Sequence, residues 1–349
     1  MEALLEEARR VLDQGSFSEA EAGFRQVLVA DPRSVPAYLG LATALNGQGR
    51  RDQALALLLE RAERWTRSGD YVSAERLWEG ALEIAPDSPQ ALAGLGRTRA
   101  LDRRLLSAEA PLQQVFDMGR ADLRTMLYLG SALWENGKPE LAEPVIRRAV
   151  EQSNRSIFAV HQLGRLLLWL GRFAEAAALL AECATDPAAG GDVDLDLARA
   201  LEGAGDLEGA LIWYRRAVDA LPVHSEARYG LALALQRSGD QAAAQRELEA
   251  YERLYQEDQQ RIIRERKQQA RIDLGRELLR QGRVEEAAEH LESLPESAES
   301  LAALAAALRT SGNLEGAVDK LLRAVALAPD REELRALLNE IRLEQLRGR

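Results

Sequence analysis

Residues 129–150 read LGSALWENGKPELAEPVIRRAV, and this stretch decides the fold. Gly137 follows a run of apolar residues at helical spacing, and Ala142 comes five residues after the glycine. The same pair recurs at a constant interval of 34 residues. Glycine also occupies positions 171, 205 and 239, and an alanine follows each of them five residues later. A period this strict predicts an array of stacked units and not one compact domain.

Each unit predicts two helices joined by a tight turn. The glycine permits the positive φ that ends the first helix, and the alanine marks where the two helices nearly touch. A bulky residue follows four positions after the alanine, as Phe24, Trp78 and Tyr214 do. Arg103 replaces the glycine in one unit and keeps the register. The other units place their turn glycines at Gly15, Gly49, Gly69, Gly137, Gly171, Gly205, Gly239, Gly282 and Gly312.

This pattern resembles the tetratricopeptide repeat (TPR) family, whose repeat reads W-x2-L-G-x2-Y…A-x3-F…P over about 34 residues. The Leu-Gly pairs at 129–130 and 163–164 and the alanine-to-bulky spacing carry the resemblance across nearly the whole chain. It implies an all-α fold, an α-solenoid of about ten helix-turn-helix repeats in a right-handed superhelix. The amphipathic sequence at the C-terminal end predicts a capping helix over the last repeat.

The glycine spacing also predicts how the chain is divided. Gly49 and Gly69 are much closer together than the period, which leaves room for one shared helix, whereas Gly239 and Gly282 are farther apart, which predicts lengthened helices. The predicted segments are a first TPR-like repeat (1–34), irregular repeats that share a helix (35–88), a regular array (89–258), repeats with a lengthened entry helix (259–331) and the capping helix (332–349).

Composition argues against catalysis and metal binding. The net charge of −11 disfavours nucleic-acid binding, and the single cysteine, Cys183, excludes an intramolecular disulfide. The three histidines lack metal-ligand spacing, and DVDLD at 192–196 lacks the glycine and terminal glutamate of a calcium loop. We therefore expect no enzyme activity, no cofactor and no metal. With no secretory signal at the start and no membrane-spanning run, we expect a cytoplasmic protein.

The resemblance implies that the first helices of the repeats line a concave groove in which a peptide or helix binds. On each of these helices, one set of residues points into the core. The residues next to that set around the helix point into the groove. We predict these partner-binding residues: Arg97, Trp134, Phe158, His161, Arg165, Trp169, Arg199, Tyr229 and Arg276. Arginine pairs bidentately with carboxylates, so the predicted ligand is acidic or carries a free C-terminal carboxylate. The alternative is that these arginines bond to neighbouring glutamates and that the aromatic residues pack between helices.

The sequence thus predicts a non-enzymatic scaffold, an adaptor in a bacterial multiprotein assembly. Two alternatives stay open. The chain could be a structural self-assembler that pairs through residues 250–270, or the regulatory subunit of a separate enzyme. The basic stretch from Arg261 to Arg271 has two interpretations, a solvated projecting helix or a nucleic-acid or membrane contact.

Overall fold

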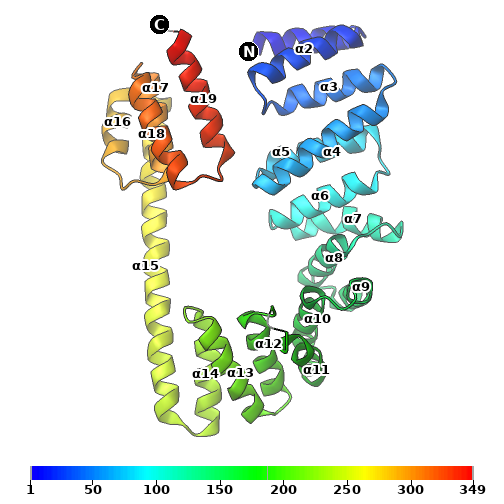
Figure 1. Ribbon diagram of the computed structural model, residues 1–349, viewed down its shortest axis with the longest axis vertical. Helices are drawn as coiled ribbons and strands as arrows, with labels where there is room; N and C mark the ends of the chain where they lie inside the picture. The colour runs from blue at the N-terminus through cyan, green and yellow to red at the C-terminus, as the bar shows by residue number, and fades with distance from the viewer. Residues whose placement is uncertain (1, 187, 348–349) are drawn as a thin grey trace. The chain divides into compact units, whose positions relative to one another are not determined.

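The computed structural model describes residues 2–186 and 188–347, which form nineteen α-helices and no strand (Figure 1). This confirms the predicted all-α repeat fold. Within the described residues, no helix combines the length and apolar character needed to cross a membrane. The chain divides into two compact units, Met1–Glu247 and Leu248–Arg349.

The first unit is a stack of helical hairpins. Its helices are α1 (Glu2–Asp13), α2 (Phe17–Ala30), α3 (Val35–Gly47), α4 (Arg51–Ser68), α5 (Tyr71–Ile84), α6 (Pro89–Leu101), α7 (Leu105–Asp117), α8 (Leu123–Glu135), α9 (Pro139–Gln152), α10 (Ile157–Trp169), α11 (Phe173–Ala184), α12 (Gly191–Gly203), α13 (Leu207–Ala220) and α14 (Ser225–Ser238). Helix α15 (Gln241–Arg280) begins in this unit and continues into the second.

Consecutive helices of the first unit pack on one another, and the first helices of successive hairpins also touch. Contacts join α4 to α6, α6 to α8, α8 to α10, α10 to α12 and α12 to α14. The closer-packed side of a curved stack is its inner side. The first helices therefore line the inner face of this unit, and α7, α9, α11 and α13 form its outer layer.

The glycine turns have the left-handed backbone that the sequence requires. Gly137 has φ 77°, a conformation that costs a side-chain-bearing residue about 1–2 kcal/mol. Arg103 occupies the equivalent turn with φ 60°, so it adopts the same strained conformation without the freedom of glycine. The turn geometry is thus kept where the glycine is lost.

Close approach between helices explains the glycines inside the first helices. A Cβ atom added to Gly164 would lie 2.6 Å from Cδ2 of Leu180, which is fully buried. In the same way a Cβ atom on Gly94 would lie 2.5 Å from the Trp78 ring. Each glycine is a notch that receives a bulky residue of the repeat. Leu180 and Trp78 belong to two separate apolar clusters of the first unit.

The segment between Gly49 and Gly69 is the single helix α4, which contacts both α3 and α5. Its first half closes one hairpin, and its second half supplies the first helix of the next. The inner face therefore includes the C-terminal half of α4.

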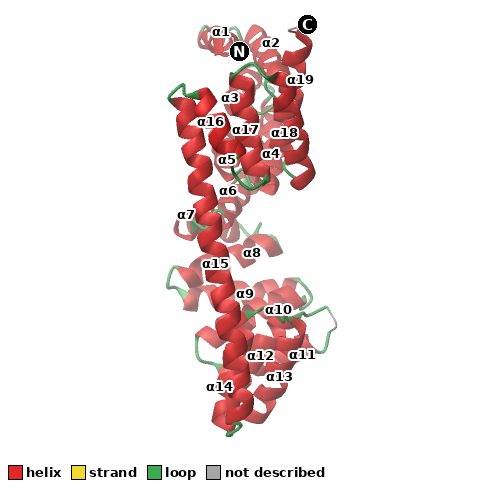
Figure 2. Ribbon diagram, turned by 90° about the vertical axis from the view of Figure 1, so that its left-hand side faces the viewer, coloured by secondary structure: helices red, strands yellow, loops and turns green. Residues whose placement is uncertain are grey.

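The second unit contains the rest of α15, which Figure 2 shows as one uninterrupted helix, and four shorter helices. These are α16 (Val284–Glu292), α17 (Ala298–Thr310), α18 (Leu314–Leu327) and α19 (Glu332–Arg347). Contacts join α16 to α17, α17 to α18 and α18 to α19. Buried Leu321, Leu338 and Ile341 hold α19 against the unit, so α19 covers an apolar face that α18 would otherwise expose.

Candidate functional site

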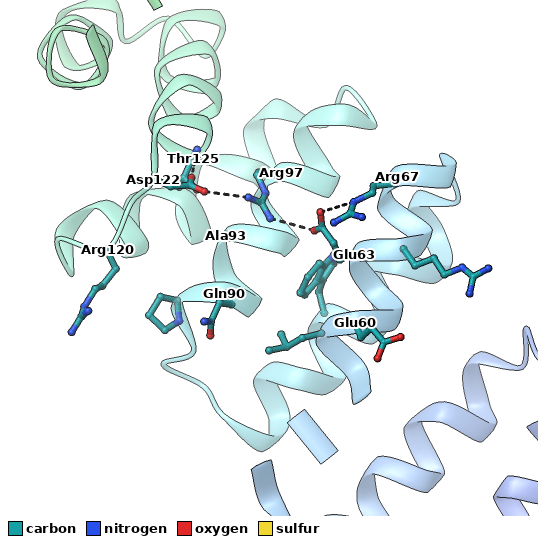
Figure 3. A pocket seen from close by; sticks show the side chains of 13 residues that line it. Glu60, Glu63, Arg67, Gln90, Ala93, Arg97, Arg120, Asp122 and Thr125 are labelled. Carbon is teal, nitrogen blue, oxygen red and sulfur yellow. Dashed lines mark hydrogen bonds and ion pairs between the residues drawn. The ribbon is translucent and has the colours of Figure 1, made fainter. Parts of the chain in front are cut away.

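An open pocket with a volume of about 1120 Å³ lies on the inner face of the first unit (Figure 3). It is formed by the C-terminal half of α4, by α6 and by the start of α8. Its polar and charged lining residues are Glu60, Glu63, Arg64, Arg67, Gln90, Arg97, Arg120, Asp122 and Thr125. Four arginines and three carboxylates make the lining slightly positive in a chain whose net charge is −11.

N-cap residues fix the starts of two helices, α6 and α8, that form walls of this pocket. Asp122 is the N-cap of α8, and its carboxylate accepts a 2.7 Å hydrogen bond from the backbone N–H of Thr125. Ser88 caps α6 in the same way, and Pro89 fills the first position of that helix. Because both caps lie at the pocket, the helix starts and their side chains are fixed relative to it.

Arg97 lies between the walls, and its side chain is only 17% exposed. Its guanidinium lies 3.4 Å from Glu63 on α4 and 3.7 Å from Asp122, as Figure 3 shows. Burial opposes ionisation of Asp122, but hydrogen bonding by Thr125 and the charge of Arg97 outweigh burial and lower its pKa. Arg97 thus bridges three repeats with two long ion pairs, and Glu63 also pairs with Arg67 at 3.1 Å.

Beneath the pocket, Trp78 is held by a buried polar group. Its indole N–H lies 3.0 Å from the hydroxyl of Thr98 and 3.2 Å from that of Thr66. The two hydroxyls are 2.8 Å apart, so one can donate to the other, and each also lies within hydrogen-bonding distance of a backbone carbonyl of its own helix. The ring therefore has one orientation, and it offers the pocket a rigid apolar edge.

A second group of polar contacts centres on Asp196 of α12, whose side chain is almost buried. Nε2 of His161 lies 2.9 Å from the carboxylate, and Nη1 of Arg199 lies 3.3 Å from it. Arg165 approaches the same carboxylate at 3.9 Å and stacks on the Trp134 ring at 5.6 Å. The structure thus brings four of the predicted residues together on α8, α10 and α12.

The other predicted residues are placed differently. Phe158 and Trp169 lie on α10 and are 61% and 57% exposed. Tyr229 lies on α14 and is half exposed, and Arg97 lines the pocket. Arg276 belongs to the second unit and pairs with Asp273 at 3.1 Å. Eight of the nine predicted residues therefore belong to the first unit, and Arg276 belongs to the second.

Three of the predicted arginines, Arg97, Arg199 and Arg276, lie within 3.4 Å of a carboxylate of this chain, and Arg165 lies 3.9 Å from one. Arg199, for example, also bonds Glu226 of α14 at 2.9 Å. This is the arrangement that the alternative interpretation of the arginines expected. A ligand carboxylate would have to compete with these pairs, although an exposed pair such as Arg199 with Glu226 contributes only about 0–1 kcal/mol. The role of these arginines in partner binding stays a prediction.

The aspartates of the DVDLD stretch do not converge. Asp194 is buried and pairs with Arg216 of α13 at 3.1 Å, whereas Asp196 points to His161. Burial raises the pKa of Asp194, and Arg216 offsets only part of that shift. Within residues 2–186 and 188–347, no cluster of three or more histidine, cysteine or carboxylate side chains could hold a metal ion.

Sequence reasoning missed most of the pocket. Glu63 precedes Arg97 by one full period of the array, so it occupies the same position of the preceding repeat. The irregular spacing of Gly49 and Gly69 hid this register. Reading the period backwards from Arg97 would have found Glu63, whereas Arg120 lies in the turn before α8 and follows no periodic signal.

Comparison with known families identifies the repeats. Tetratricopeptide repeat profiles match residues 11–64, residues 104–157, 161–225 and 272–332, and residues 225–250. No curated protein matches the chain.

Several solved structures are similar to this chain. YrrB, described as a TPR protein with an unusual peptide-binding site, has 21% identity and a TM-score of 0.41 over 58% of this chain and 95% of its own. A tetratricopeptide repeat protein from Parabacteroides merdae has 15% identity and a TM-score of 0.49 over 83% of this chain and 99% of its own. MamA from Desulfovibrio magneticus has 18% identity and a TM-score of 0.45 over 48% of this chain and 96% of its own. These values are too low to transfer a ligand or a role.

Proposed function

Because the chain belongs to the tetratricopeptide repeat family, whose arrays are protein-interaction scaffolds, we propose that it binds a partner peptide or helix along the inner face of its first unit. The binding is non-enzymatic, and in a multiprotein assembly it makes the chain an adaptor. The first helices α6, α8, α10 and α12 provide the surface.

The exposed aromatic residues of α10 carry this proposal. Phe158, Arg165 and Trp169 are spaced by seven and then four residues, so they lie on one face of the helix. Two large aromatic side chains that are more than half exposed on one helix face are unusual, because water disfavours such apolar area. Aromatic residues and arginine are also the types that most often dominate binding energy at interfaces. This face is therefore suited to the apolar anchors of a partner.

Charge suggests which partner fits between these anchors. Arg165 is about half exposed and lies 3.9 Å from the Asp196 carboxylate, beyond hydrogen-bonding distance, so its guanidinium can still donate to a ligand. Arg199 holds the well-exposed Glu226, a partner that a ligand carboxylate could replace at little cost. The proposed ligand is an acidic segment, or one that ends in a free carboxylate, with apolar side chains on either side of the charge.

The test is selection of binding peptides from a random display library, followed by measurement of their affinity for variants. We expect selected peptides to be rich in acidic and apolar residues. Arg165→Glu combined with Arg199→Glu should weaken binding at least ~10-fold, as should Phe158→Ala combined with Trp169→Ala, because each removes at least about 1.4 kcal/mol of interaction.

Arg215→Glu is the matched control, because Arg215 is exposed on α13 in the outer layer. It reverses the charge of one arginine away from the proposed surface and should leave the affinity unchanged. Peptides that bind all of these variants equally well would contradict the proposal.

A further inference from the structure

The middle of α15 carries an exposed apolar and charged face of its own. Tyr255 is 46% exposed and Ile263 is 50% exposed. With Glu252, Gln259 and Arg266 they are spaced by three, four, four and three residues. At 100° per residue, these five side chains lie within about 40° of one line along the helix. No residue from 252 to 266 is buried, and the whole segment belongs to the second unit.

Along this part of α15, charges at matching distances on the two sides of Gln259 have opposite signs. Residues at equal distances before and after Gln259 carry opposite charge in three cases within the segment: Glu257 with Arg261, Arg253 with Glu265, and Glu252 with Arg266. No equidistant pair between residues 247 and 271 carries like charges. The exposed apolar residues, Tyr255 and Ile263, are equidistant from Gln259 too.

Several of these charges are not used inside the chain. In the part of the chain that the structure describes, no ion pair joins Glu252, Arg253, Glu257 or Arg266 to another side chain. Arg261 does pair, with Asp258 and with Glu265 of its own helix. The exposed face therefore combines the apolar area of Tyr255 and Ile263 with two charges, Glu252 and Arg266, that the described part of the chain does not pair.

We infer that a second copy of this chain binds here, with its α15 antiparallel to the first and the two-fold axis at Gln259. Glu252 of one copy then faces Arg266 of the other, and Tyr255 packs on Ile263. Each contact occurs twice, as a two-fold interface requires. The two Gln259 amides meet at the axis, where each can donate to and accept from the other.

The charge order selects this occupant over others. A uniformly acidic partner would be repelled by Glu252 at one end of the face, and a uniformly basic partner by Arg266 at the other end. A parallel second copy would place like charges opposite each other. The face spans 14 residue steps, about 21 Å, which is short for a stable interface, so the dimer is weak and forms at high protein concentration.

The experiment measures self-association of the full chain by sedimentation equilibrium. The chain should show a monomer–dimer equilibrium that weakens as ionic strength rises. One variant, Glu252→Lys, makes both ends of the face basic, and a second, Arg266→Glu, makes both ends acidic. Each alone should dimerise at least ~10-fold more weakly, and an equimolar mixture should restore association as a heterodimer.

Circular dichroism verifies that each variant keeps its helix content, so that loss of association is not loss of folding. A native chain that stays monomeric at the highest attainable concentration would overturn the inference. So would two charge-reversed variants that do not associate when mixed.

Orientation is tested by mixing Glu252→Cys with Arg266→Cys, both with Cys183→Ser. Under mild oxidation, the antiparallel arrangement should join one variant to the other by a disulfide. A parallel pair would instead join each variant to itself, which would contradict the two-fold axis at Gln259.

Discussion

Helices α10 and α15 both expose large apolar side chains, but the two helices are held in different ways. In α10 one face presents Phe158 and Trp169, while the opposite side buries Leu163, Leu166 and Leu167 almost completely. In α15 the segment from 252 to 266 has no buried residue at all. A packed core therefore fixes the position of the exposed residues of α10. The exposed residues of α15 are held in position by the helix backbone and by ion pairs within the helix.

This difference shows what the glycine period controls. Where the period holds, close contacts at glycines and buried leucines fix each helix against its neighbours. The exposed side chains of such a helix are therefore held in fixed positions. Where it lapses between Gly239 and Gly282, the chain continues as an extended helix whose stretch from 252 to 266 has no buried residue. The comparison predicts that equivalent substitutions in the two helices have unequal effects.

The largest difference is expected for added volume. Gly164→Val in α10 should lower the free energy of unfolding by about 3 kcal/mol, because the new side chain would overlap Leu180 in a filled core. Ala270→Val in α15 adds similar bulk at an exposed position and should change stability by less than about 0.5 kcal/mol. Urea denaturation of both variants gives the comparison. Equal losses would show that α10 is not packed more tightly than α15.

A smaller difference is expected for lost ion pairs. Asp196→Ala should cost about 2 kcal/mol, because it leaves His161, Arg165 and Arg199 clustered without their shared carboxylate. Asp258→Ala removes an exposed carboxylate whose partner is Arg261 of the same helix, and should cost about 0.3 kcal/mol. Thermal unfolding monitored by circular dichroism measures both. If Asp196→Ala costs no more than Asp258→Ala, the Asp196 cluster does not stabilise the array.

The repeat fold could be predicted from sequence because its signals are local. A turn that needs positive φ selects glycine at Gly137, and a close helix approach selects glycine at Gly164; both effects act within one hairpin. The surface was harder to predict, because it depends on residues one repeat apart. The contact of Asp196 with His161 joins two successive repeats, and the pattern around Asp196 resembled part of a calcium loop more than an arginine partner.

The pocket shows the same limit. Arg97 was predicted to face the groove, but Glu63 and Asp122, which hold it, come from an irregular repeat and from a helix cap. Glu63 lies one period before Arg97, and Asp122 occupies the N-cap position that recurs at Ser88 and Ser156, but the period does not show that both side chains reach Arg97. Ion pairs between repeats also determine how many donors of an arginine side chain are available to a ligand. That availability can be determined only from the three-dimensional structure.

The smallest expected effect concerns Arg103, where the array departs from its own turn pattern. Arg103 holds φ 60° and is exposed, so Arg103→Gly relieves the strain of the left-handed backbone and should raise stability by about 0.5 kcal/mol after the entropy cost of glycine. Ala270→Gly, in the middle of α15, should instead lower stability by about 1 kcal/mol, since that position is helical and gains nothing from glycine. Chemical denaturation of the two glycine variants would thus give changes of opposite sign. A loss at both positions would mean that the Arg103 side chain stabilises its turn by more than the strain it imposes.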